Sequence, residues 1–218
     1  MFYQKTPKIF DDLKVESFSL PGGNLTYFPN AFSCLEADNY LKLLLNEVEW
    51  TQPTLKIFGR TVQQPRLSAW YADNKIPYTY SRFTQYGLPW KSNILKVKEK
   101  TQKITRFNFN SALLNYYRDG RDSMGWHSDN EPELGESPIV ASISFGEARI
   151  FNLKNRADKT LKKSIQLDHG SILLMSGDTQ NNWLHQISKS AKNMGPRINI
   201  TFRRVDEKIA HKIAERNK

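Results

Sequence analysis

The sequence predicts a mainly β protein of the α+β class, built as one domain. Short runs rich in β-branched and aromatic residues recur at even spacing between residues 106 and 204, and Asp-Gly, Phe-Gly and His-Gly turn signals separate them. Two stretches with helical spacing precede these runs. A chain of 218 residues is long enough for one domain with a sizeable core. We therefore expect a β-sandwich or barrel with helices on its N-terminal side.

The N-terminal part is predicted to contain a turn and two helices. The turn lies at Pro21-Gly22-Gly23-Asn24, after which Tyr27-Phe28 leads into the first helix. Apolar residues recur with helical spacing over residues 35–48, which is typical of a helix packed on a core. The second helix is predicted over residues 92–104, with Ser92 as its N-cap and its lysines on a solvated face.

Strands and turns are predicted between the two helices, over residues 51–81. Lys56-Ile57-Phe58-Gly59-Arg60 is typical of a hairpin tip, with glycine for the tight turn. Two interpretations of Phe58 stay open. It is either an apolar wedge that inserts into a base stack or an ordinary packed aromatic residue.

The segment after this hairpin combines basic and aromatic residues. Arg66 is a candidate for contact with a phosphate or a base edge, and Trp70 and Tyr71 offer planar faces on which a flipped base can stack. Because adjacent residues on a strand point in opposite directions, we expect one of the two aromatic residues to stack.

The second half of the chain is predicted to be β, followed by a charged helix over residues 206–218. The predicted strands are residues 113–118, 139–145, 149–154, 164–167, 171–175 and 197–203.

The charge and composition narrow the class of partner. The formal net charge is +10, which favours a polyanionic partner, above all nucleic acid, over the alternative of an inert basic surface. Cys34 is the single cysteine, so no intramolecular disulfide can form, as in a reducing compartment. No apolar run suits a signal peptide or a membrane span. We expect an intracellular monomer without a membrane partner, in the cytoplasm or in the nucleoid or nucleus.

His127 and Asp129 are two positions apart, so on a strand their side chains would lie on one face. A second histidine, His185, follows at long range. Two imidazoles and one carboxylate suit iron(II), and leave positions open for a co-substrate and oxygen. Beyond the second histidine lies the stretch from Pro196 to Arg203, and an arginine there can bind the carboxylate of an organic acid in a bidentate fork. A histidine pair alone indicates little, but this combination predicts an iron site.

At these residues the chain resembles a known family, the AlkB-type iron(II)- and 2-oxoglutarate-dependent dioxygenases of the animal-like nucleic-acid repair subgroup. The resemblance covers residues 25–204. It is carried by Phe58-Gly59, Pro65-Arg66, Ala69-x-Tyr71, Asn115-x-Tyr117, His127-x-Asp129-x-Glu131, Ser142-x-Ser144-Phe145-Gly146, Asp168-His169-Gly170-Ser171, His185 and Pro196-Arg197-x-Asn199-x-Thr201-Phe202-Arg203.

The resemblance implies a double-stranded β-helix (jelly-roll) core over residues 106–204 with flanking N-terminal helices and a nucleotide-recognition lid over residues 51–90, all in one domain spanning residues 1–218. It implies Fe(II), 2-oxoglutarate and O₂ as cofactor and co-substrates. The implied iron ligands are His127, Asp129 and His185, and the implied 2-oxoglutarate pocket consists of Asn115, Tyr117, Arg197, Asn199, Thr201 and Arg203.

On the substrate side, the resemblance implies that Tyr71 and His127 sandwich a damaged base while Glu131 faces its exocyclic nitrogen. Phe58 matches a finger residue that fills the gap left by a flipped base, and Arg66 and Trp70 complete the implied substrate site. The implied reaction is hydroxylation of an N-methyl group on 1-methyladenine or 3-methylcytosine in DNA, or also in RNA. The product then collapses to formaldehyde and the repaired base.

Three alternatives stay open from the sequence. The first is a demethylase of single-stranded RNA, the second a nucleic-acid-binding module without catalysis, and the third an oxygenase acting on protein or a small molecule. The remaining histidines are not expected to bind metal: His169 lies in a predicted turn with a structural hydrogen bond, and His211 lies in the charged C-terminal segment. Asp178 and Glu147 are expected to be surface carboxylates.

Overall fold

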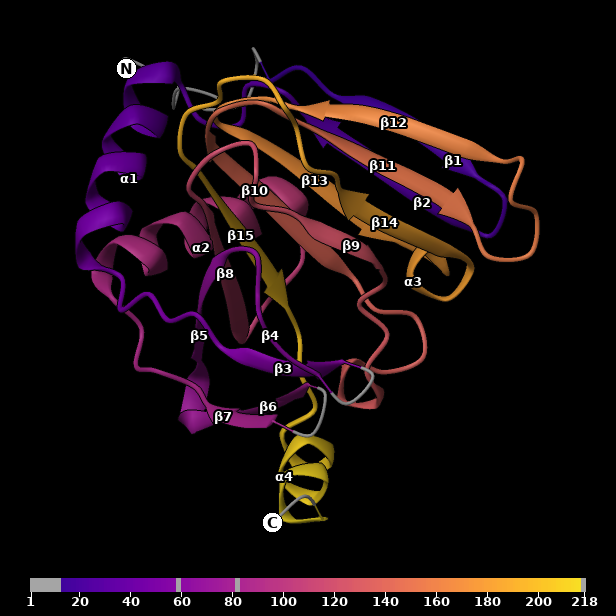
Figure 1. The fold of residues 1–218 in the computed structure, drawn as a ribbon. Coiled ribbons are helices and arrows are strands. Elements are labelled where there is room, and N and C mark those ends of the chain that lie inside the picture. Colours follow the sequence, from indigo (N-terminus) through magenta and orange to yellow (C-terminus); the bar gives the residue numbers. More distant parts are fainter. Residues whose placement is uncertain (1–12, 58–59, 81–82, 217–218) are drawn as a thin grey trace, which may run out of the picture.

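The computed structural model describes residues 13–57, 60–80 and 83–216. Their main feature is a pair of facing antiparallel sheets (Figure 1). The seven-stranded sheet has the order β1 (Glu16–Leu20), β2 (Gly23–Phe28), β13 (Ser171–Ser176), β10 (Val140–Gly146), β15 (Arg197–Arg203), β8 (Ser111–Tyr117), β5 (Leu67–Ala72). The four-stranded sheet has the order β12 (Lys162–Leu167), β11 (Arg149–Asn155), β14 (Trp183–Ile187), β9 (Met124–His127). This is the jelly-roll core that the sequence predicted.

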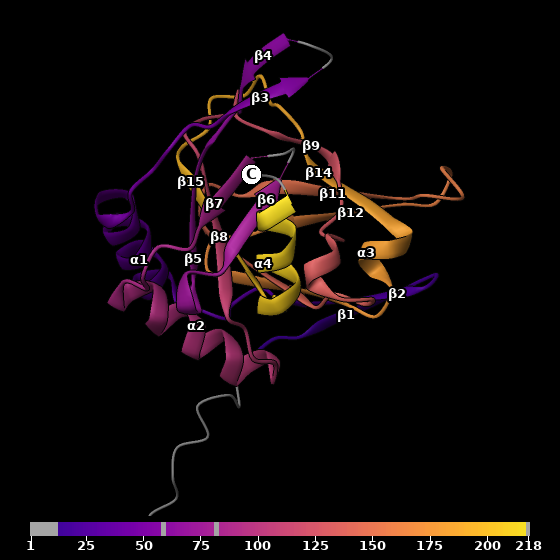
Figure 2. The ribbon, with the colours of Figure 1, turned by 90° about the horizontal axis from the view of Figure 1, so that it is seen from below.

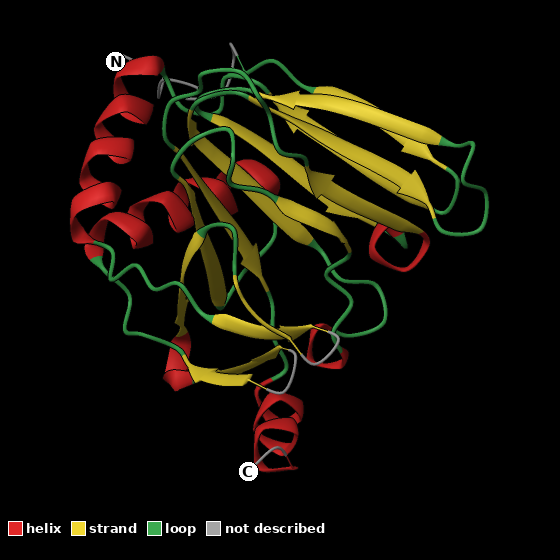
Figure 3. Ribbon diagram, in the orientation of Figure 1, coloured by secondary structure: helices red, strands yellow, loops and turns green. Residues whose placement is uncertain are grey.

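Two apolar layers hold these sheets in place. One lies between the sheets, where Leu173 and Met175 of the large sheet meet Phe151, Leu153 and other buried residues of the small sheet. The other lies on the far face of the large sheet, which α1 (Cys34–Glu47) and α2 (Ser92–Thr105) cover (Figure 3). Polar residues line one end of the space between the sheets, and the candidate active site lies there.

Both predicted N-terminal helices are present, and α1 begins with a capping box that the periodicity did not show. The Ser33 side chain accepts a hydrogen bond from the Glu36 N–H, and the Glu36 carboxylate accepts one from the Ser33 N–H. In α2 the prediction of Ser92 as N-cap was wrong by one residue. Lys91 occupies the cap position with extended backbone angles, and Ser92 is already helical.

Two short hairpins stand beside β5. Strand β3 (Thr54–Ile57) pairs with β4 (Arg60–Gln63) so that Ile57 faces Arg60. The predicted hairpin is thus confirmed, while Phe58 itself lies outside the described residues. The second hairpin pairs β6 (Pro77–Tyr80) with β7 (Phe83–Tyr86). Figure 2 shows both hairpins on the side of the molecule where the C-terminal helix α4 (Glu207–Arg216) lies.

The remaining elements are short. They are η1 (Asp73–Lys75), η2 (Pro132–Leu134) and α3 (Thr179–Asn182). No helix among the described residues is long and apolar enough to cross a membrane.

The strand predictions held for the six long runs, with ends shifted by a few residues. The prediction that Tyr27-Phe28 leads into a helix was wrong, because both residues belong to β2 and pair with β13. Leu25 and Tyr27 are buried with the two-residue period of a strand. The turn before them is tighter than predicted: Leu20 pairs with Gly23, which leaves Pro21-Gly22 as the connection.

Candidate active site

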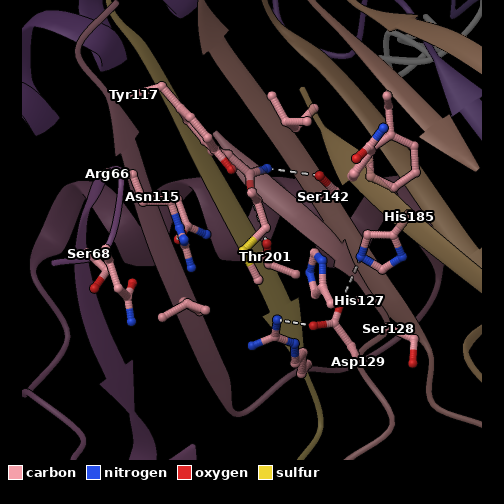
Figure 4. Close-up of a pocket in the computed structure, with 18 of the residues that line it drawn as sticks. Arg66, Ser68, Asn115, Tyr117, His127, Ser128, Asp129, Ser142, His185 and Thr201 are labelled. Atoms are coloured by element: carbon pink, nitrogen blue, oxygen red, sulfur yellow. Dashed lines mark hydrogen bonds and ion pairs between the residues drawn. The ribbon is translucent and has the colours of Figure 1, made fainter. Parts of the chain in front are cut away.

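One face of β8 and β15 forms the floor of the site. The strands pair so that Asn199 faces Asn115 and Arg197 faces Tyr117. Since side chains alternate along a strand, Arg197, Asn199, Thr201 and Arg203 share the face that lines the pocket, while Ile198, Ile200 and Phe202 pack against the helices. Figure 4 shows Asn115, Tyr117 and Thr201 projecting from these strands toward the two histidines.

The two histidines come from the opposite sheet. His127 ends β9 and lies directly across from His185 on β14, with 4.2 Å between the ring centroids. Asp129 completes the group, and the candidate ligand atoms of the three residues all lie within 4.8 Å of one another. Asp129 follows the end of β9, so the expected strand alternation is not what positions it. Its backbone N–H instead donates to Gln180 Oε1 at 3.0 Å.

The electrostatics of the three residues suit a divalent metal ion. Burial is the largest single effect on Asp129 and acts to raise its pKa, but Arg203, which donates to Asp129 Oδ1, and the two histidines together lower the pKa below its ordinary value. Burial lowers the pKa of His127, and burial together with His127 lowers the pKa of His185 to about 3. Both imidazoles are therefore neutral at neutral pH, as metal ligands must be. His127 Nδ1 lies 2.9 Å from the Gly125 carbonyl oxygen, which leaves Nε2 for a metal.

Arg197 forms an anion site deeper in the pocket. Its side chain is 1% exposed, and its Nη2 donates to Ser144 Oγ at 3.0 Å. Nε and Nη1 have no hydrogen-bond partner among the described residues, and no salt bridge joins Arg197 to a described carboxylate. Burial lowers the pKa of Arg197 to about 10, so it remains charged at neutral pH. A buried guanidinium with two unused donors matches the carboxylate of an organic acid.

Polar pairs hold the rest of the floor in place. Asn199 donates to Ser142 Oγ and to the Ile143 carbonyl, and its Oδ1 accepts from Thr201. Asn115 Oδ1 accepts from Arg66 Nε at 2.6 Å. Because these bonds tie neighbouring strands together, the floor is fixed before any ligand binds.

The mouth of the pocket is formed by a tyrosine and a glutamate. Tyr78 donates from its hydroxyl to Glu131 Oε1 at 3.1 Å, and its ring stacks on Trp70 with centroids 4.7 Å apart. Burial raises the pKa of Glu131, although the nearby Arg203 acts in the opposite direction. Arg66 also lines the pocket.

Comparison with known proteins identifies the family. The model of the 2OG-Fe(II) oxygenase superfamily matches residues 24–203. The chain belongs to this superfamily. It is 42% identical over 194 residues to the alpha-ketoglutarate-dependent dioxygenase alkB homolog 3 of Bos taurus, covering 84% of this chain and 67% of that one. Identity to the Homo sapiens protein of that name is 40%, over 91% of this chain and 73% of the relative. It is therefore an AlkB-type dioxygenase.

One further relative agrees with this assignment, and a solved structure shares the fold. The DNA oxidative demethylase ALKBH2 of Arabidopsis thaliana is 35% identical, over 84% of this chain and 67% of its own. Among solved structures, OsALKBH1 superposes with a TM-score of 0.56 at 16% identity, covering 88% of this chain and 100% of that one. At this low identity the structural likeness supports the fold alone.

The AlkB-type enzyme uses Fe(II), 2-oxoglutarate and O₂. The residues present fit these groups. His127, Asp129 and His185 would hold the iron as a two-histidine, one-carboxylate face. The unused donors of Arg197 would pair with a carboxylate of 2-oxoglutarate. When bound, the iron and 2-oxoglutarate supply the oxidising power, and the protein supplies ligand geometry, charge and exclusion of water.

Two substrate-side predictions need correction. Tyr71 is fully buried on the opposite face of β5, in the core under the helices, so it cannot stack on a base in the pocket. Strand alternation explains this, since Arg66, Ser68 and Trp70 share the pocket-side face and Tyr71 does not. Trp70 supports the pocket from behind Tyr78 instead of lining it.

Arg66 departs from one of its two predicted roles. It is 6% exposed and its Nε is held by Asn115, so it is not available to a phosphate on the protein surface. The other predicted role, contact with a base edge, remains a prediction, and Arg66 lies in the pocket where such an edge would bind.

Some functional residues escaped the sequence analysis. Tyr78 belongs to an aromatic and basic segment, but nothing in its spacing distinguished it from Tyr71. Gln180, which holds the Asp129 backbone, carried no signal at all. His169, by contrast, has the predicted structural role: its Nδ1 accepts a hydrogen bond from the Gly146 N–H at 2.7 Å. Asp178, Glu147 and His211 are all exposed, as expected.

Proposed function

We propose that this enzyme oxidatively demethylates N-alkylated bases, with 1-methyladenine and 3-methylcytosine in DNA as its substrates and RNA as a further one. The single observation that supports this most strongly is the Tyr78–Glu131 pair, which faces the same pocket as the histidines and Asp129. A base methylated on its Watson–Crick edge carries positive charge. The carboxyl group of Glu131 is half-buried and its pKa is raised by desolvation, so such a cation would stabilise its ionised form.

The reaction balances with the co-substrates of the family. One oxygen atom of O₂ enters the N-methyl group, whose C–H bond becomes C–OH. The other enters 2-oxoglutarate, which is released as succinate and CO₂. The C–N bond of the resulting hemiaminal then breaks, its electron pair stays on the ring nitrogen to give the neutral base, and the hydroxyl proton passes to solvent as formaldehyde leaves.

A methylated base is also the easiest one for such a pocket to select. It pairs badly, so removing it from a helix costs less than removing an intact base. We infer that residues 51–90 act as the nucleotide-recognition lid, since Pro53, Gln64, Tyr78 and Gln85 from this range line the pocket. The net charge of +10 supports a nucleic-acid substrate.

The decisive test is turnover of a 1-methyladenine oligonucleotide with iron(II), 2-oxoglutarate and ascorbate, followed by mass spectrometry. We expect loss of one methyl group, formaldehyde release, and complete inhibition by a metal chelator. Asp129→Ala should abolish turnover while the circular dichroism spectrum stays that of the folded protein. Consumption of 2-oxoglutarate with an unchanged oligonucleotide would refute the proposed substrate.

Strand preference is tested by Phe58, which lies between β3 and β4 in the sequence. If Phe58 fills the gap left by a flipped base, Phe58→Ala should lower turnover of methylated duplex DNA while turnover of the same single strand is unchanged. Equal turnover of the duplex by both proteins would refute the wedge role of Phe58.

A further inference from the structure

The outer face of the small sheet points away from the pocket and is open. On β11, Phe151 and Leu153 are buried against the large sheet, so Asn152 and Lys154 lie on the outer face. On β14, His185 and Ile187 are buried on the inner side, and Leu184 and Gln186 between them are half-buried. Figure 1 looks onto this face, and no helix among the described residues crosses it.

An exposed tryptophan stands at the edge of this face. Trp126 directly precedes the iron ligand His127, but Met124 and His127 line the pocket and Trp126 does not. A bulge between β9 and β14 places one residue of β14, Gln186, opposite two residues of β9. Trp126 is 38% exposed, although an indole gains more from burial than any other side chain of this chain.

Basic side chains gather around that indole. Lys154 Nζ lies 4.1 Å from the centre of the Trp126 ring. Arg156 is exposed, and its Nη2 donates to Ser128 Oγ at 2.6 Å, which fixes the guanidinium near the end of β9. Neither cation forms a salt bridge with a carboxylate among the described residues. Lys154 lies over the Trp126 ring, and no described carboxylate neutralises either cation, so both remain able to attract a phosphate.

We propose that this face binds an unpaired stretch of the nucleic-acid strand whose methylated base occupies the pocket. One flanking base stacks on Trp126, and the adjoining phosphates lie against Lys154 and Arg156. An open sheet face with an exposed aromatic ring and cations beside it is the composition that single-strand-binding surfaces share. A duplex does not meet this requirement, because its bases already stack on one another. The proposal rests on the proposed function for the identity of the strand.

The position of Trp126 makes it a neighbour of the reacting nucleotide. The indole and the iron ligand are consecutive residues, and β9 is the edge strand of its sheet. A strand that leaves the pocket over this edge meets Trp126 first and then Lys154 of β11 and Arg156, which follows β11. The contact is thus made by a flanking nucleotide, and a substrate too short to reach it should not sense its loss.

The test compares long and short substrates in three variants. Trp126→Ala should raise KM for a long methylated single strand about tenfold, with kcat unchanged, because one base–aromatic stack is lost. Trp126→Ala should turn over a methylated trinucleotide with the same KM and kcat as wild type. Trp126→Phe should restore most of the affinity for the long strand. Phe107→Ala, which removes an aromatic ring of similar exposure (36%) elsewhere, should leave KM unchanged for both substrates.

Three outcomes separate this proposal from the proposed function. Unchanged kinetics of Trp126→Ala on the long strand would overturn the binding face. Equal losses on the long strand and the trinucleotide would also overturn it, since Trp126 would then act through His127. If wild type demethylates neither substrate, the proposed function fails. The binding face is then tested by itself, by fluorescence anisotropy with an unmodified labelled single strand. A tenfold weaker Kd for Trp126→Ala supports the binding face, and a Kd equal to that of wild type overturns it.

Discussion

At the scale of single residues, two buried arginines on one strand show how the site divides its work. Arg203 donates to Asp129, and this contact raises the pKa of Arg203 while it keeps the carboxylate ionised. Arg197 has no carboxylate partner in the part of the chain that the structure describes, and burial lowers its pKa to about 10. The first arginine stabilises the metal ligand, and the second keeps its charge for a ligand from outside the chain.

Arg197 carries the first prediction. Arg197→Met should raise KM for 2-oxoglutarate at least thirtyfold, because loss of one member of a buried charge pair costs about 2–5 kcal/mol. The KM of Arg197→Lys for 2-oxoglutarate should lie between the values of wild type and Arg197→Met, since an ammonium cannot form the bidentate fork. The measurement is 2-oxoglutarate consumption at saturating iron. An unchanged KM in Arg197→Met would show that the co-substrate binds elsewhere.

Gln180 carries the second prediction. Gln180→Leu removes the acceptor of the Asp129 N–H, and an orphaned buried N–H costs about 1–3 kcal/mol. We expect iron affinity to fall about 10–100-fold, as for other residues that orient metal ligands. Iron titration of activity measures this. Gln166→Leu, at an exposed position, is the control and should leave the iron requirement unchanged.

The sequence identified the metal ligands but not the aromatic residue of the pocket, and the reason is physical. His127, Asp129, His185 and Arg197 could be recognised by their chemistry, because few residue types bind iron or a carboxylate. The choice between Tyr71 and Tyr78 depends on which face of β5 meets the pocket. That face is set by pairing with β8, which is a long-range contact. Gln180 acts through the backbone of Asp129, so its side chain type left no motif.

At the scale of secondary-structure elements, α4 supports the mouth of the pocket. Ala210 and Val205 pack in one cluster with Trp70, Ile76 and Tyr78. The backbone just ahead of the helix is tied to η2, since the Asp206 N–H donates to the Glu133 carbonyl. The C-terminal helix thus contacts the aromatic side of the pocket and the segment next to Glu131, but not the iron ligands.

This arrangement gives the third prediction. Ala210→Asp places a charge in the apolar cluster and should lower the free energy of unfolding by roughly 1–3 kcal/mol. KM for methylated oligonucleotide should rise, while 2-oxoglutarate consumption without nucleic acid is retained. Thermal denaturation and the two kinetic assays measure these effects. His211→Asp, with the same new charge at an exposed position, should match wild type.

Elements were predictable where local pattern and packing agree. The helix over 35–48 and the six long strands carry enough periodic residues to show their structure. Strands β9 (Met-Gly-Trp-His) and β14 (Trp-Leu-His-Gln-Ile) hold the histidines, but neither shows the alternation or the β-branched run that marked the predicted strands. Strand β2 was assigned to the approach of a helix because its pairing with β13 joins residues far apart in the chain.

At the scale of the whole molecule, each sheet supplies half of the site. The large sheet carries the arginines and asparagines, and the small sheet carries the histidines, so the site exists only when the sheets face each other. The apolar layer between the sheets therefore fixes the distance from the iron ligands to Arg197. No local sequence pattern encodes that distance, which is why the residues were predictable and their separation was not.

The last prediction concerns the net charge of the molecule, because salt should affect the binding of nucleic acid and of 2-oxoglutarate differently. With a net charge of +10 and unpaired cations on the outer face, nucleic-acid binding should weaken steeply with salt. About three phosphate contacts on a single strand correspond to a slope near −2 in a plot of log affinity against log salt. KM for 2-oxoglutarate should change less than about twofold, since Arg197 is buried and screened little. Steady-state kinetics across a salt series measure both. If the KM for the oligonucleotide and the KM for 2-oxoglutarate had the same salt dependence, binding of the long strand would depend on the pocket alone. If neither KM changed with salt, a polyanionic substrate would be excluded.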